Sequence, residues 1–161
     1  TKSYLFEPVT VMVEKIRAGE LTSEELVGQF INQINLVNPI INAVVEMNPN
    51  ALNDARELDE YFQREGKVKG RLHGIPVTIK EHIAMKGFHY TVSATNPTNK
   101  DITKKYFMQN GLMIHADVIA TEDSAIVKRL KKEGAVILGT TNMMESGVGL
   151  FSWHFNLERL P

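Results

Sequence analysis

The sequence predicts an α/β fold in which helices flank a mixed β-sheet with at least some parallel strands. Apolar strand-like runs alternate with amphipathic helical segments along the chain, which is the pattern of layered α/β proteins. The runs "GIPVTIK" and "AVILG" are apolar enough for interior strands that are buried on both faces. With 161 residues the chain can build one core, so a single domain is expected over residues 1–161.

Composition narrows the classes of function. Lysine plus arginine number 18 against 19 acidic residues, a net charge of -1, so no nucleic-acid partner is expected. The absence of cysteine excludes disulfides, thiolate metal sites and cysteine nucleophiles. Neither a signal peptide nor a membrane-spanning run is visible, which favours a cytoplasmic protein, with any membrane association left to segments outside this sequence.

Two helices and a strand are predicted in the first part of the chain. Apolar residues at helical spacing from position 9 to 16, followed by Gly19, indicate a short helix. Thr22 and Glu25 form a capping box that begins a second helix. Asn38-Pro39 is expected to stop that helix, because proline disfavours helix in the residue before it. The β-branched run 41–47 then predicts a strand.

The remaining elements follow the same logic. A third helix is predicted from Ala51 to Gly66, then the interior strand that ends at Lys80. Residues 88–120 mix turn formers and charges and are read as a long loop or insertion. A helix that buries Ile126, Val127 and Leu130 is predicted next, closed by Gly134 and followed by a buried strand.

Lys80 draws attention because it ends an apolar strand. On the residues alone it is read more readily as a surface lysine, since lysines at strand ends usually reach solvent. The alternative is chemical: burial disfavours the charged form of a lysine, and a neutral amine can take a proton from a serine hydroxyl. Serine-lysine pairs of this kind hydrolyse amides.

Other candidate motifs are weak. The histidines lack the spacing of a metal site, and no metal or other cofactor is expected. "GAVILGTTN" lacks the lysine of a phosphate-binding loop. Ser146 in "NMMESGVG" lacks the flanks of a nucleophile elbow, and its glycine-rich surroundings favour a close backbone approach to a ligand or strand.

Four segments together resemble the amidase signature family in order and spacing: "LTSEELVGQFINQINLVNPIINAVVEMN", "ALNDARELDE", "GRLHGIPVTIKE" and "DSAIVKRLKKEGAVILGTTNMMESG". The resemblance implies the N-terminal third of an amidase signature domain and hydrolysis of small-molecule carboxamides by a lysine, a bridging serine and a nucleophilic serine. Lys80 matches the catalytic lysine. Glu145, Ser146 and Gly147 match a turn that lines the substrate site. The Lys80-Glu81 pair is similar to that of fatty-acid amide hydrolases.

The family's two serines lie in a later Gly/Ser-rich stretch, so this chain is expected to carry the base without the nucleophile and to be inactive alone. Its partner would be the remainder of the same protein or a second copy. Two alternatives stay open: a truncated, non-catalytic paralogue that acts as a binding module, and the glutaminase subunit of a tRNA-dependent amidotransferase. The loop after Gly87 is also longer than the family pattern implies.

Overall fold

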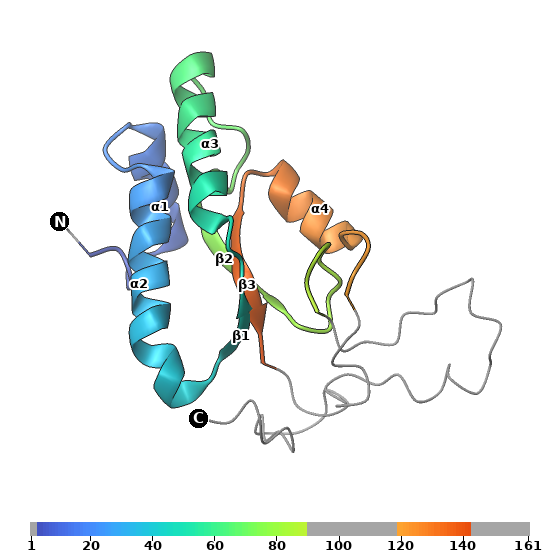
Figure 1. Ribbon diagram of the computed structural model, residues 1–161. Coiled ribbons are helices and arrows are strands. Elements are labelled where there is room, and N and C mark those ends of the chain that lie inside the picture. The colour runs from blue at the N-terminus through green and yellow to red at the C-terminus, as the bar shows by residue number, and fades with distance from the viewer. Residues whose placement is uncertain (1–2, 90–118, 143–161) are drawn as a thin grey trace, which may run out of the picture.

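The computed structural model describes residues 3–89 and 119–142. Its helices and strands are α1 (Val9–Arg17), α2 (Ser23–Ile41), β1 (Val44–Met47), α3 (Ala51–Glu65), β2 (Pro76–Lys80), α4 (Ala125–Lys132) and β3 (Val136–Thr141). The strands form one mixed sheet in the order β1-β3-β2, with β3 parallel to β2 and antiparallel to β1. Helices α1 to α3 lie on one side of the sheet and α4 on the other (Figure 1). The predicted α/β architecture with a mixed sheet is confirmed.

Strand β3 is the centre of this arrangement because its side chains alternate between two cores. Val136 and Leu138 pack with Ala55 of α3 and with other residues of α2 and α3. Ile137 points to the opposite face and packs with Val127 of α4. Burial on both faces is the reason that this strand reads as an unbroken apolar run.

Strand β2 is less enclosed than the sequence predicted. It pairs with β3 along one edge, and within the described residues no strand covers its other edge. Ile79 is buried, whereas Thr78 is exposed. In the part of the chain that the structure describes, β3 is the interior strand and β2 lies at the side of the sheet.

The helix ends show where local signals succeed and fail. Thr22 caps α2 as predicted, since its hydroxyl accepts a hydrogen bond from the Glu25 N–H at 3.0 Å. The prediction that Asn38-Pro39 stops α2 is wrong, because the helix runs on to Ile41 with Pro39 inside it. The last turn survives because the N–H of Asn42 closes it on the Asn38 carbonyl at 2.8 Å.

Helix α4 buries a narrower face than predicted. Val127 is fully buried and Leu130 packs beside it, as expected. Ile126 is 54% exposed, so its predicted place in the core is wrong. At about 100° per residue, Leu130 lies between Val127 and Ile126 around the helix axis, so burial that is centred on Val127 reaches Leu130 in part and leaves Ile126 at the exposed margin.

Most of the predicted loop 88–120 lies outside the described residues. The described ends of that range meet each other: the N–H of Gly87 donates to the Ala120 carbonyl at 2.8 Å, and the N–H of Ala120 donates to the Phe88 carbonyl at 2.9 Å. No helix in the described ranges is both long enough and apolar enough to cross a membrane.

Candidate functional site

Lys80 lies where the parallel strands β2 and β3 end together. It is the last residue of β2 and is paired with Thr141, the last residue of β3. Its side chain is half-buried, and the Nζ donates a hydrogen bond to the backbone carbonyl of Asn142. The amine is therefore fixed at the carboxyl end of the sheet rather than extended into solvent, which is the usual position of catalytic groups in α/β folds.

The two residues that follow Lys80 are also shielded from solvent. Glu81 is 2% exposed, and its N–H donates to the Thr141 carbonyl at 3.0 Å. His82 is half-buried, and its Nδ1 is a buried ring nitrogen with no hydrogen-bond partner among the described residues. A buried ring nitrogen without a partner is costly, so a polar group that reached the His82 Nδ1 at this end of the sheet would be stabilised there.

A group of asparagines joins this end of the sheet to the end of α2. Asn42 has a left-handed backbone (φ 45°, ψ 45°) and ends the helix. The side chain of Asn38 accepts from the Val44 N–H and donates to the Val44 carbonyl, each at 2.8 Å. The side chain of Asn142 donates to the Asn42 carbonyl at 3.1 Å.

The sequence alone did not predict that these asparagines join the end of α2 to the end of β3. The available signal was residue type, since asparagine is one of the few residues besides glycine that tolerates a left-handed conformation and can also bond to the backbone. The other predicted site residues, Glu145, Ser146 and Gly147, lie outside the described residues. Their suggested role in substrate binding stays a prediction.

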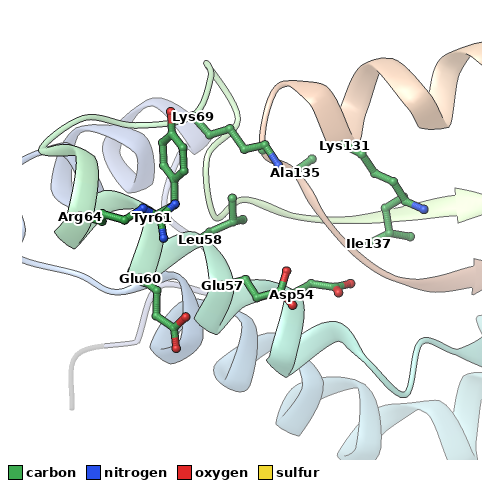
Figure 2. A pocket seen from close by; sticks show the side chains of 11 residues that line it. Asp54, Glu57, Leu58, Glu60, Tyr61, Arg64, Lys69, Lys131, Ala135 and Ile137 are labelled. Atoms are coloured by element: carbon green, nitrogen blue, oxygen red, sulfur yellow. The ribbon is translucent and has the colours of Figure 1, made fainter.

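A pocket of about 480 Å³ lies at the opposite end of β3. It is lined by Asp54, Glu57, Leu58, Glu60, Tyr61, Arg64, Lys69, Lys131, Gly134, Ala135 and Ile137. Figure 2 shows Asp54 and Glu57 projecting from α3, with Lys69 and Lys131 on the opposite wall. Nothing in the sequence indicated this pocket, because its lining residues come from separate parts of the chain: α3, the loop after it, α4, and the start of β3.

Several charges around the pocket already have partners. The Lys131 ammonium contacts the Asp123 carboxylate at 2.7 Å, and Arg64 contacts Glu65 at 3.0 Å. Burial raises the pKa of Asp123, but hydrogen bonds from Lys131 and from the Lys86 N–H outweigh it and leave that pKa below its ordinary value. The charges of Lys131 and Arg64 are therefore paired within the protein.

His73 is buried behind the pocket and is 1% exposed. Its Nδ1 accepts the backbone N–H of Lys69 at 2.9 Å, and its ring packs 6.4 Å from that of Tyr61. Burial lowers the pKa of His73; the Asp59 carboxylate opposes this effect, and the Lys69 ammonium adds to it. We interpret His73 as a neutral structural residue, as the sequence had suggested for the histidines.

Within residues 3–89 and 119–142, no three histidine, aspartate or glutamate side chains are grouped so as to hold a metal ion. Among the described side chains, the amine of Lys80 stands out as a candidate reactive group. It is the one predicted site residue that the described structure contains.

Comparison with known proteins places the chain in a family. Residues 25–154 match the family model described as Amidase. The chain is 34% identical over 137 residues to a subunit of the glutamyl-tRNA(Gln) amidotransferase of Fusobacterium nucleatum, a match that covers 84% of this chain and 24% of that protein. It is 33% identical over 141 residues to fatty-acid amide hydrolase 2-A of Danio rerio, covering 83% of this chain and 23% of that protein.

A solved structure agrees with this placement. The native peptide amidase of Stenotrophomonas maltophilia superposes with a TM-score of 0.68 at 29% identity, covering 88% of this chain and 26% of that one. The chain belongs to the amidase family, the amidase signature enzymes that the sequence resembles. It spans about a quarter of the length of these relatives.

Proposed function

We propose that this chain is part of an enzyme that hydrolyses the carboxamides of small molecules, with Lys80 as its general base. The observation that carries the proposal is the placement of the Lys80 amine at the common end of β2 and β3, where the Asn142 carbonyl holds it. Membership of the amidase family supports the reaction class.

In the proposed mechanism the Lys80 side chain, in its amine form, accepts a proton from a bridging serine. That serine in turn accepts the proton of the nucleophilic serine as its oxygen attacks the amide carbonyl. Proton return to the nitrogen of the amide releases the amine or ammonia and leaves an acyl-enzyme, which water then hydrolyses. The resemblance assigns both serines to a stretch that follows the segments found here, so the 161-residue chain by itself is proposed to show no turnover.

The substitution that tests this proposal is Lys80→Ala in the complete protein that contains this chain. We expect amide turnover to fall by several orders of magnitude, because base and nucleophile act as a unit, while the fold persists. Lys128→Ala on the exposed face of α4 removes the same charge far from the site and serves as the matched control. Normal turnover in a folded Lys80→Ala protein would refute the assignment.

A second candidate function is the glutaminase step of a tRNA-dependent amidotransferase. One relative of the chain carries the name of such an amidotransferase component. The chemistry at Lys80 would be the same, with glutamine as the amide, but a stoichiometric protein partner would be needed. Co-purification of further subunits with the tagged complete protein favours this function, and a hydrolase that is fully active alone argues against it.

The non-catalytic alternative makes the opposite prediction for the same assays. A binding module would bind an amide or a protein partner and show no turnover that depends on Lys80. Such a result in the complete protein, with the fold confirmed by circular dichroism, would replace the hydrolase proposal.

A further inference from the structure

We propose that Asn142 is a positioning residue that fixes the Lys80 amine, an inference that rests on the proposed function of Lys80. The geometry that points to it is a chain of hydrogen bonds. It runs from the end of α2, through the side chain and backbone of Asn142, to the Nζ of Lys80.

The first step is the contact between Lys80 and Asn142. A lysine ammonium is a point charge on a flexible four-carbon stem, and its three donors do not by themselves define a direction. A carbonyl that does not move removes part of this freedom. The Asn142 carbonyl accepts the hydrogen bond from Nζ, so the position of the Asn142 backbone sets the position of the amine.

The second step concerns what holds the Asn142 backbone, since β3 ends one residue earlier at Thr141. The N–H of Asn142 donates to the Ala43 carbonyl at 2.8 Å. Its side-chain Nδ2 donates to the Asn42 carbonyl at 3.1 Å. Two consecutive carbonyls just after α2 therefore hold a residue that no longer belongs to the strand.

The third step concerns the anchor itself. Asn42 is the one non-glycine residue with a positive φ, 45°, in the part of the chain that the structure describes. This conformation turns the chain sharply out of α2, and the N–H of Asn42 remains bonded to the Asn38 carbonyl at 2.8 Å. The carbonyls of residues 42 and 43 are thus presented by a fixed helix end, which makes them a rigid support.

The test compares two asparagines of the same junction. Asn142→Ala removes the bond to Asn42 while leaving every backbone group in place. Asn38→Ala is the matched control, because it removes two bonds of 2.8 Å to Val44 but leaves the backbone bond from Asn42 to residue 38 and both bonds of Asn142 in place. Both variants should be destabilised, so loss of stability alone does not distinguish them.

The first measurement is independent of activity. Relaxation of the ¹⁵N-labelled ammonium group of Lys80 in this chain, assigned by the signal missing from Lys80→Ala, reports how firmly the amine is held. We expect markedly greater mobility in Asn142→Ala and unchanged mobility in Asn38→Ala. Equal mobility of the Lys80 ammonium in the wild type and Asn142→Ala would overturn the inference.

The second measurement uses the complete protein. Displacement of a reacting group by about 1 Å can cost about 100-fold in rate, so Asn142→Ala should lower kcat by about 10- to 100-fold with KM changed less than about twofold. Asn38→Ala should leave both near the wild-type values. If Asn142→Ala fails to fold, Asn142→Ser keeps a polar residue there that is too short to reach Asn42, and the same expectations apply.

The outcomes separate this inference from the proposed function. Normal turnover in Lys80→Ala refutes the proposed function whatever Asn142 does. Loss of turnover in Lys80→Ala, together with equal kcat values in Asn142→Ala and Asn38→Ala, keeps the function and refutes the positioning role.

Discussion

The two ends of strand β3 hold their polar groups in different ways. At the carboxyl end, Lys80 and Asn142 bond to backbone carbonyls, which the sheet and the end of α2 keep in place. At the amino end, the walls of the 480 Å³ pocket carry long charged side chains such as those of Glu57 and Lys69, which are both exposed. The pocket is thus lined mainly by charged side chains, whereas the carboxyl end is built on backbone groups.

This difference shows that cavity size is a poor guide to chemistry in this fold. A reacting group must be held in place before the substrate arrives, and backbone carbonyls achieve this with no loss of side-chain entropy. Exposed ion pairs such as Lys131 with Asp123 constrain much less and are screened by salt. We therefore place the reaction at the backbone-built end of β3.

The largest predicted effect comes from breaking the carboxyl end of β3. Gly139 has a φ of 153°, and a Cβ there would overlap the Glu46 carbonyl oxygen and approach the Met47 Cα to 3.0 Å. The backbone of Glu46 and Met47 could make room for this Cβ only if β1 moved away from β3. Gly139→Ala should therefore lower the free energy of unfolding by about 3 kcal/mol or more, measured by urea denaturation.

Gly66→Ala is the matched control for this substitution. Gly66 also has a positive φ, 65°, but a Cβ there would have no neighbour within 4 Å. The expected cost is only the left-handed conformation itself, about 1 kcal/mol. A smaller effect for Gly139→Ala than for Gly66→Ala would mean that β1 can move away from β3, and the rigid carboxyl end would lose its basis.

The next effect concerns the amino end and depends on pH. Burial holds the pKa of His73 below its ordinary value, so the unfolded chain binds this proton more readily than the folded chain does. The contribution of His73 to the free energy of unfolding is therefore fully present above about pH 6.5. It declines as the pH falls below that value, by at most about 1.4 kcal/mol per pH unit. Urea denaturation between pH 7.5 and 5.5 measures this decline.

His73→Asn should flatten that pH dependence, although it lowers stability at pH 7.5 through lost packing against Tyr61 and Phe62. An unaltered decline in His73→Asn would show that another group is responsible.

The layered fold could be predicted from the sequence because its helices and strands depend on local sequence patterns. The capping box at Thr22 and the apolar run of β3 were each visible within a few residues. The error at Pro39 has a tertiary cause: contacts of Asn38 with Val44, across the turn that follows the helix, help to stabilise a last turn that proline alone would disfavour.

The candidate site was predictable only in part, for a related reason. Lys80 could be named because it ends a strand within a resemblance that extends over most of the chain. The proposed role of Asn142 could not be inferred from the sequence, because it rests on a contact with Asn42, which lies 100 residues away in sequence. Sequence periodicity contains no information about such a contact, whereas the structure shows it directly as the hydrogen bond from the Asn142 side chain to the Asn42 carbonyl.

The smallest predicted effects come from the pocket. Lys69→Gln and Glu57→Gln each remove one charge from its walls, and each should change stability at pH 7.5 by less than about 0.5 kcal/mol. Because the Lys69 ammonium contributes to the lowered pKa of His73, Lys69→Gln should also make the decline in stability between pH 7.5 and 5.5 smaller. Glu57→Gln lacks this link and should not.

Neither pocket substitution should alter amide turnover by the complete protein by more than about twofold, because the reaction is placed at the other end of β3. Turnover assays of both variants beside Lys80→Ala decide the matter. A tenfold loss in Lys69→Gln or Glu57→Gln, with folding intact, would mean that the pocket takes part in the reaction. The proposed division between a reactive carboxyl end and a structural amino end of β3 would then be wrong.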